Sequence, residues 1–325
     1  MLELAVVIVS YNVRDLLRDC LTSVLANQGI SLAVCVVDND SPDASADMVK
    51  AEFPQVHLIR STNCGYPAGN NLGLRHFGFS DQPSVVSRQS PAVSGQPSAT
   101  SEPRLEARNP QAEIPRYALL LNPDTVVPPD AFARVVTYMD AHPAVGVLGV
   151  KLLLRDGSLD LACRRGFPTP EVSFYRFSGL SRLFPHSPRF GRYNMTFLDP
   201  DQTGEVDSTT GAFMLVRGTA IAQVGLLDEV FWMYGEDLDW AFRIKQCGWK
   251  VMYNPEVAVR HVKRASSRGS ARARYEFERA MWVFYRKHYR AATPRWVDAL
   301  VRLGLGLRGG PRLRAEMRTP GGEVQ

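Results

Sequence analysis

The stretch Tyr117-Ala-Leu-Leu-Leu-Asn-Pro-Asp-Thr125 determines the fold that we expect for this chain. It begins with a continuous apolar run, the pattern of a strand that is buried on both faces. Pro123 has no amide hydrogen and a fixed φ, so the strand cannot continue through it. Asn122 and Asp124 are therefore expected at the carboxyl end of a buried strand, where open α/β sheets bind ligands. A simple turn is the alternative, because Asn-Pro and Asp are common turn residues.

The segments on both sides of this stretch alternate between strand-like and helix-like patterns. Apolar runs at 4–9, 33–37 and 57–60 predict strands, and the amphipathic segment that follows residue 12 predicts a helix. Alternation of this kind predicts an α/β fold with a mostly parallel sheet flanked by helices. Because each strand ends in polar residues, we expect these residues to share one edge of the sheet.

The second half of the chain is expected to be less regular. Residues 163–205 carry many aromatic residues among prolines and arginines, and we expect an irregular lid or acceptor wall there, or a simple cover over the core. Two separate strands are predicted at 249–254 and 257–259. A long basic helix is predicted at 272–290, followed by a shorter amphipathic helix at 296–305.

Composition divides the chain into a globular body and a tail. Residues 80–115 are rich in Ser, Pro, Gln and Ala without periodicity, which predicts a disordered insertion in a domain spanning residues 1–290. Residues 291–325 are expected to form a basic amphipathic tail. From residue 260 to the end there are 16 Lys and Arg against 5 Asp and Glu, within an overall net charge of +5. Such a segment favours an anionic surface, either phospholipid or nucleic acid.

Several classes of protein do not fit the sequence. No run of about twenty apolar residues is present, so no spanning helix is expected. The N-terminus enters a strand-like run without a basic leader, which argues against a secretory signal. Five scattered cysteines without a CxxC pair indicate neither a disulfide framework nor a zinc knuckle, and a reducing cytoplasm fits best.

Several separated motifs together resemble glycosyltransferase family 2, whose members have the GT-A fold, a Rossmann-like α/β architecture, here followed by C-terminal helices. The similarity is greatest to the rhamnosyltransferase-like branch of bacterial polysaccharide assembly, and it covers roughly residues 3–290 outside the insertion. The motifs that carry it are Val9-Ser-Tyr-Asn12, Val37-Asp-Asn39, Asn63-x-Gly65, Asn70-Asn-x-Gly73, Asn122-Pro-Asp124, Gly235-Glu-Asp-x-Asp-Trp240 and His261.

The resemblance implies a nucleotide site built from the first half of the chain. Asp38 is expected to accept the imide N–H of uracil or thymine. The residues expected to surround the base, the ribose and the nucleotide crevice are Ser10, Tyr11, Asn12, Asn63, Gly65 and Asn71. For Gly65, turn geometry alone is an equally good explanation.

A divalent cation, Mn²⁺ or Mg²⁺, is the implied cofactor. A cation held by oxygen ligands neutralises a departing diphosphate. Asp124 is the expected ligand, and His261 matches the position of the family's third ligand, where an imidazole favours manganese. Asn122 stands where the family usually has a first aspartate, and we expect it to bind the ribose or a metal-bound water. For His261, a surface histidine beside basic residues is the alternative.

The acidic run at residues 236–239 is expected to carry the catalysis. By resemblance, Asp237 is the base that takes the proton of the acceptor hydroxyl. Glu236 and Asp239 would position the acceptor or orient Asp237. Helix capping is the alternative, because carboxylates stabilise helix N-termini. Asp207 and Thr210 resemble residues near the sugar and the acceptor, and Trp232 belongs to a turn that the family places above the acceptor.

The resulting hypothesis is an inverting hexosyltransferase of cell-surface polysaccharide synthesis. Rhamnose from dTDP-rhamnose is the favoured donor, with a UDP-hexose or UDP-N-acetylhexosamine as the alternative. The expected acceptor is a glycan or a polyprenyl-linked glycan, and the expected location is cytoplasmic, with peripheral membrane contact through the tail and no nucleic acid partner. A non-catalytic nucleotide or glycan binder that retains the fold is the alternative from another class.

Overall fold

The computed structural model describes residues 2–81, 114–263 and 271–318. The insertion predicted at 80–115 lies almost wholly outside the described residues, as does the end of the tail from residue 319. Within the described residues the strands form one sheet in the order β3-β2-β1-β4-β8-β6-β9-β5, with β7 paired to β9. The strands are β1 (Leu4–Ser10), β2 (Leu32–Asn39), β3 (His57–Ser61), β4 (Tyr117–Leu121), β5 (Thr125–Val126), β6 (Val145–Leu153), β7 (Gly204–Glu205), β8 (Phe213–Arg217) and β9 (Lys250–His261).

The helices follow the apolar periodicity of the sequence. In α1 the buried residues Leu17, Cys20, Leu21 and Val24 recur every three or four positions, which is one face of a helix. The helices are α1 (Arg14–Leu25), α2 (Ser45–Glu52), α3 (Tyr66–His76), α4 (Ala131–Ala141), α5 (Pro170–Phe177), α6 (Leu180–Leu183), α7 (Gly218–Val224), α8 (Glu236–Gln246), α9 (Ala271–His288) and α10 (Arg295–Glu316), with 3₁₀ turns η1 (Leu161–Cys163), η2 (Arg192–Asn194) and η4 (Arg290–Ala292).

The sheet is mixed, with a parallel part and an antiparallel part. Strand β1 pairs in parallel with β2 and β4, and β2 pairs in parallel with β3. Strand β8 runs antiparallel to both β4 and β6, and Leu121 at the end of β4 pairs with Phe213 at the start of β8. Residues that precede β8 therefore meet residues that follow β4 at one edge of the sheet, which places the 207–211 segment beside Asn122.

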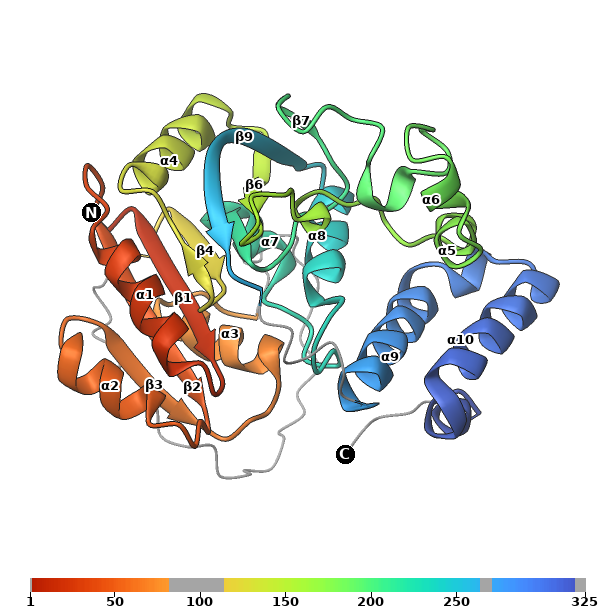
Figure 1. Ribbon diagram of the computed structural model, residues 1–325, viewed down its shortest axis with the longest axis horizontal. Coiled ribbons are helices and arrows are strands. Elements are labelled where there is room, and N and C mark those ends of the chain that lie inside the picture. The colour runs from red at the N-terminus through yellow and green to blue at the C-terminus, as the bar shows by residue number, and fades with distance from the viewer. Residues whose placement is uncertain (1, 82–113, 264–270, 319–325) are drawn as a thin grey trace, which may run out of the picture.

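Buried side chains fill two clusters. The larger one surrounds the sheet and includes every residue of β4, none of which is more than 1% exposed. The smaller one joins α9 and α10 to Phe231 and Leu238. Figure 1 shows α9 and α10 side by side at one end of the molecule, opposite α2 and β3. The C-terminal helices are thus packed on the body of the protein near the start of α8.

Three sequence predictions need correction. Strand β9 is one strand rather than two, and its register against β6 shifts between Val150 and Lys151, which absorbs the irregular middle of the segment. The region 163–205 contains α5 and α6. Helix α10 is longer than predicted and passes through a kink at Gly310, where φ is +76°, a conformation that glycine adopts without strain. Among the described helices, none has the length and apolar character needed to cross a membrane.

Candidate active site

The Asn122-Pro123-Asp124 segment lies at the sheet edge, as its sequence predicts. The amide of Asn122 donates to Ala212 O at 3.1 Å, which ties it to the start of β8. The buried hydroxyl of Tyr66 lies 3.0 Å from Asn122 Oδ1 and 3.1 Å from Gly211 O. The Asn122 side chain is therefore held by α3, and its backbone is held by the segment before β8.

Asp124 and His261 face each other across the pairing of β5 with β9. Thr125 pairs with His261, and Val262 N donates to Asp124 O at 2.7 Å. This pairing brings His261 Nε2 to 3.3 Å from Asp124 Oδ1, with side chains that are 6% and 16% exposed. The two residues predicted as metal ligands are thus brought together by the strands on which they lie.

Asp160 lies on the other side of the His261 ring, and sequence reasoning missed it. His261 Nδ1 is 2.9 Å from Asp160 Oδ2, and Lys263 Nζ is 3.1 Å from each oxygen of the same carboxylate. Burial disfavours the charged imidazole, but the carboxylates of Asp124 and Asp160 outweigh it and raise the pKa of His261 to about 9. Asp160 therefore fixes the ring so that Nε2 points toward Asp124.

The donor set suits a cation that is completed by its substrate. Among the described residues, no group of three or more His, Cys, Asp or Glu is arranged to hold a metal ion. The facing oxygen of Asp124 and nitrogen of His261 are both ligands that Mn²⁺ accepts. An imidazole ligand oriented by a carboxylate on its other nitrogen is the usual arrangement at protein metal sites. Two such ligands leave positions for diphosphate oxygens.

Asp237 lies in the first turn of α8 and is held by Arg165. Arg165 Nη2 donates to Asp237 Oδ2 at 2.5 Å and to Thr209 O at 2.6 Å. Gly211 N also donates to Asp237 Oδ2, at 3.1 Å. Since Tyr66 contacts both Asn122 and Gly211, a chain of polar contacts links Asp237 to the end of β4. Sequence reasoning missed Arg165, which comes from the segment expected to be irregular.

Glu236 differs from Asp237 in its surroundings. Its side chain is buried, and among the described residues Oε2 has no hydrogen-bond partner. Burial, together with the adjacent charge of Asp237, raises the pKa of Glu236 to about 8. At neutral pH Glu236 is therefore mostly protonated, so that it can donate a hydrogen bond but is a poor proton acceptor.

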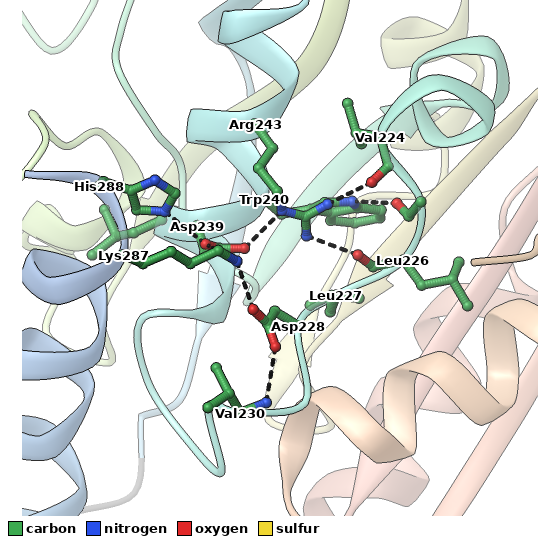
Figure 2. Close-up of polar contacts among 12 residues, drawn as sticks. Val224, Leu226, Leu227, Asp228, Val230, Asp239, Trp240, Arg243, Lys287 and His288 are labelled. Atoms are coloured by element: carbon green, nitrogen blue, oxygen red, sulfur yellow. Dashed lines mark hydrogen bonds and ion pairs between the residues drawn. The ribbon is translucent and has the colours of Figure 1, made fainter. Parts of the chain in front are cut away.

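Asp239 belongs to a separate cluster that joins α8 to α9 (Figure 2). Its fully buried carboxylate accepts from Arg243 Nε at 2.8 Å and from His288 Nε2 at 2.7 Å, and Lys287 Nζ is 2.8 Å away. Arg243 also donates to the carbonyls of Val224 and Leu226. The geometry does not support the predicted action of Asp239 on the acceptor or on Asp237, because residues two apart on a helix point in different directions. We assign Asp239 to the structural cluster.

Ser10 and Asp38 form a polar pair on neighbouring strands. They are register partners of β1 and β2, and both are buried. Asp38 Oδ1 accepts from Ser41 N at 2.9 Å, whereas Asp38 Oδ2 and Ser10 Oγ are buried without a partner among the described residues. Tyr11 is exposed beside them, and Asn12 adopts a positive φ of 55°. Buried polar atoms of this kind are usually satisfied, so these two point to a ligand.

Gly65 lets the start of α3 approach the loop that precedes α8. Its φ is +100°, and a Cβ at this position would lie 2.4 Å from Trp232 O. Tyr66 N donates to the same carbonyl at 2.9 Å, Asn63 Oδ1 accepts from Gly65 N, and Arg272 stacks on the Trp232 ring at 3.9 Å. The close approach that Gly65 permits is therefore to Trp232.

Both polar atoms of the Asn71 side chain form hydrogen bonds within the protein. Its Oδ1 accepts from Leu227 N, and its Nδ2 donates to Leu227 O and to Glu229 Oε1, at 2.8–3.1 Å. The side chain is fully buried. The structure therefore places Asn71 as a brace between α3 and the 227–229 segment, and a contact with the nucleotide stays a prediction.

Asp207 lies close to Arg165 but is paired with other residues. Its Oδ2 accepts from Phe167 N at 3.2 Å and from Arg192 Nη2 at 3.0 Å. Lys245 Nζ lies 3.7 Å from the other oxygen. Asp207 thus holds the 165–167 turn in place, and a contact with sugar or acceptor stays a prediction.

Comparison with known proteins places the chain in a family and a fold. The family model of glycosyltransferase-like family 2 matches residues 3–276. An N-acetylglucosaminyl-diphospho-decaprenol L-rhamnosyltransferase of Mycobacterium tuberculosis is 26% identical over 264 residues, which are 81% of this chain and 77% of the relative. The low-salt glycan biosynthesis hexosyltransferase Agl10 of Haloferax volcanii is 22% identical over 75% of this chain and 62% of its own.

Solved structures share the fold. TarS residues 1–349 of S. aureus align with a TM-score of 0.51 at 14% identity, covering 98% of this chain and 76% of TarS. The mannosyltransferase PcManGT of Pyrobaculum calidifontis, solved with GDP-Man and Mn²⁺, gives a TM-score of 0.52 at 15% identity over 94% of this chain and 72% of its own. These findings confirm the predicted GT-A architecture. The chain belongs to glycosyltransferase family 2 and is a rhamnosyltransferase-like enzyme of nucleotide-sugar glycosyl transfer.

Proposed function

We propose that this glycosyltransferase moves rhamnose from dTDP-rhamnose to a lipid-linked glycan with inversion at the anomeric carbon. The observation that carries the proposal is the convergence of three groups at one sheet edge. These are the Ser10–Asp38 pair, the facing Asp124 and His261, and the Asp237 carboxylate. The choice of donor and acceptor rests on the mycobacterial relative, whose name specifies rhamnose and a diphospho-decaprenol acceptor.

The nucleobase would bind beside Ser10 and Asp38. Thymine and uracil each carry one imide N–H, which a carboxylate accepts, and carbonyl oxygens, which a hydroxyl can approach as donor. The unpartnered Asp38 Oδ2 and Ser10 Oγ match that pattern. Both bases fit, so this pair selects a pyrimidine nucleotide without choosing between dTDP and UDP.

Asp124 and His261 would hold a divalent cation, with Asp160 keeping the imidazole in place. When bound, Mn²⁺ or Mg²⁺ stabilises the charge that develops on the departing diphosphate. An imidazole must be neutral to bind a metal, so His261 releases its proton on loading. Asn122, fixed by Tyr66, is left to contact the ribose or a metal-bound water.

Asp237 would act as the base. Inversion by direct displacement needs one group, opposite the leaving diphosphate, that takes the proton of the acceptor hydroxyl. Arg165 and Gly211 N hold one oxygen of this carboxylate in a fixed position. Glu236, protonated at neutral pH, would donate a hydrogen bond to the acceptor or the sugar.

We also propose that the enzyme acts at the cytoplasmic face of a membrane through peripheral contact. Four large apolar residues of α10 are between 59% and 69% exposed and recur at helical spacing, namely Trp296, Leu300, Leu303 and Leu307. They lie in the segment whose sequence carries the excess of basic residues. Such a face suits an anionic bilayer, and co-sedimentation with anionic and neutral vesicles at two salt concentrations tests it.

A donor panel tests the function. The full chain with Mn²⁺ and a prenyl-diphospho-N-acetylglucosamine acceptor is given dTDP-rhamnose, UDP-glucose, UDP-galactose or UDP-N-acetylglucosamine, and product is followed by mass spectrometry. We expect transfer from dTDP-rhamnose. Transfer from a UDP-sugar alone would replace the rhamnose assignment. Nucleotide binding without transfer from any donor would favour a non-catalytic binder.

A further inference from the structure

Two cavities outside the candidate active site share a wall. The first, of about 650 Å³, lies between α5 and α10 and is largely apolar, with Phe174, Phe177, Met281, Trp296, Leu300 and Val301 among its lining residues. Figure 1 shows α5 next to the ends of α9 and α10. This volume falls in the range of roughly 300–1,000 Å³ that is typical of small-molecule sites.

The residues of the apolar cavity include some of the most exposed large apolar side chains in the described structure. Phe174 is 62% exposed, Trp296 69% and Leu300 59%. They come from two different helices and face one hollow. A concentration of this kind marks an interaction site for an apolar group, because folding alone does not favour leaving such side chains in water.

The second cavity, of about 640 Å³, is basic. Arg176, Arg182 and Arg308 line it, and no Asp or Glu is among its lining residues. Arg308 and Phe177 line both cavities, and the Arg308 guanidinium lies 4.2 Å from the centre of the Phe177 ring. Arginine guanidinium groups bind phosphate oxygens through paired N–H donors. The basic cavity, which suits an anion, thus adjoins the apolar cavity, which suits a hydrocarbon chain.

One short segment connects these cavities to the proposed base. Gly166 N donates to the carbonyl of Tyr193, a lining residue of the basic cavity, at 2.8 Å. The preceding residue, Arg165, holds Asp237. Pro168, a little further along the chain, lines the apolar cavity. A molecule that fills both cavities therefore lies beside the segment that fixes the base.

We propose that the two cavities bind the isoprenyl diphosphate of a lipid-linked acceptor, with the chain in the apolar cavity and the diphosphate beside the arginines. This inference rests on the proposed function and locates its acceptor. Charge complementarity selects the occupant. Arg308 is paired with Glu278 at 2.7 Å, but Arg176 and Arg182 have no carboxylate partner among the described residues. The cavity therefore keeps a positive charge that suits an anion, and the adjoining apolar cavity suits the hydrocarbon attached to it. A bilayer surface would use the whole exposed stripe of α10, whereas only Trp296 and Leu300 of that stripe line the cavity.

The test is calorimetric titration of the full chain with geranylgeranyl diphosphate below its micelle concentration. Geranylgeraniol lacks the diphosphate, and inorganic diphosphate lacks the chain, so we expect both to bind more weakly. Leu300→Asp should weaken binding on the order of tenfold or more. Leu303→Asp is the matched control, since both leucines are 59% exposed on α10 and only Leu300 lines the cavity. It should bind like the wild type.

A second pair of variants tests the basic cavity independently. Arg182→Gln should weaken binding of geranylgeranyl diphosphate by about tenfold, the effect of losing a hydrogen bond to a charged group. Arg295→Gln, an exposed arginine of α10 outside both cavities, should leave binding unchanged. Equal losses in Leu300→Asp and Leu303→Asp, or equal affinity for geranylgeraniol and its diphosphate, would overturn the proposal.

Sugar transfer to a soluble aryl glycoside separates this proposal from the function on which it rests. In Leu300→Asp we expect KM for the prenyl-linked acceptor to rise more than KM for the soluble aryl glycoside, because only the prenyl-linked acceptor would occupy the cavity. Transfer to the aryl glycoside without any binding of geranylgeranyl diphosphate would refute the lipid site and leave the function standing. Absence of transfer from every donor would refute the function instead.

Discussion

Replacing Asp160 by asparagine should weaken cation binding although Asp160 does not face the cation. The carboxylate lies 2.9 Å from His261 Nδ1 and holds the ring with Nε2 toward Asp124. The Asp160→Asn side chain keeps the shape and one acceptor but loses the charge. A hydrogen bond to a charged group contributes roughly 1.5–3 kcal/mol, which corresponds to about 10–100-fold in affinity. Loss of a carboxylate behind a histidine ligand at known metal sites also costs roughly 10–100-fold.

The assay is titration of Mn²⁺ in the presence of dTDP, with free Mn²⁺ followed by electron paramagnetic resonance. Asp156→Asn is the matched control, because Asp156 lies in the same connection between β6 and η1 and its side chain bonds only to Ser158 among the described residues. It should bind Mn²⁺ as the wild type does. Thermal unfolding of both variants verifies that the fold is intact.

Two results would refute the reasoning in different ways. Wild-type affinity in Asp160→Asn, together with strong loss in His261→Ala, would remove Asp160 as a positioning residue. Wild-type affinity for Mn²⁺ in His261→Ala would show that His261 is not a ligand. Asp160 would then have no ligand to position.

Three further predictions concern the base, the loop contact and the structural cluster. Asp237→Asn should lower kcat by about 10²–10⁴ with unchanged affinity for dTDP, and a kcat within tenfold of the wild type would exclude Asp237 as the base. Gly65→Ala should lower the free energy of unfolding in urea by roughly 1–3 kcal/mol, because the residue has positive φ and its Cβ would meet Trp232 O at 2.4 Å; an unchanged value would contradict that account. Burial opposes ionisation of Asp239, but His288, Arg243 and Lys287 outweigh it and lower its pKa from 3.8 to about 2. This carboxylate thus stabilises the fold above about pH 4, by roughly 2 kcal/mol, and the contribution disappears as the pH falls toward 2. Asp239→Asn should therefore unfold more easily at pH 7 and show a smaller loss of stability between pH 4 and pH 2, as measured by urea titrations at each pH.

The parts of the site that could be predicted are those that lie at strand ends. Asn122 and Asp124 follow a strand that proline terminates, and β9 ends at His261, so simple rules of sheet topology bring them to one edge. Ser10 and Asp38 also end neighbouring strands and become register partners. Such residues are placed by backbone pairing, which the apolar pattern of the sequence encodes.

The parts that were missed depend on tertiary contacts. Arg165 and Asp160 lie where no hydrophobic periodicity exists, and their partners are more than seventy residues away along the chain. Asp239 was grouped with Asp237 because both open the same helix, yet successive helical residues are rotated by about 100°, which turns the two carboxylates to different neighbours. The contact of Asn71 with Leu227 was likewise not predictable, because it depends on the packing of α3 against a distant segment.

Strand β8 shows that an apolar pattern does not predict the direction in which a strand runs. Residues 211–216 were expected to be a strand, and β8 occupies Phe213–Arg217, but it runs antiparallel to its neighbours. An apolar run predicts that a strand is buried, but it does not predict whether the strand runs parallel or antiparallel to its neighbours. This reversal places Gly211 beside Asn122 and gives Asp237 its backbone donor.

The most direct test of the account is sugar transfer by Asp124→Ala compared with Asn122→Asp. With dTDP-rhamnose, Mn²⁺ and a prenyl-linked acceptor, we predict that Asp124→Ala abolishes transfer and that Asn122→Asp keeps or strengthens Mn²⁺ binding. The physical reason is that Asp124 supplies the carboxylate of the proposed cation site, whereas Asn122 adds no charge to it. Turnover by Asp124→Ala at the wild-type rate would contradict the central assignment.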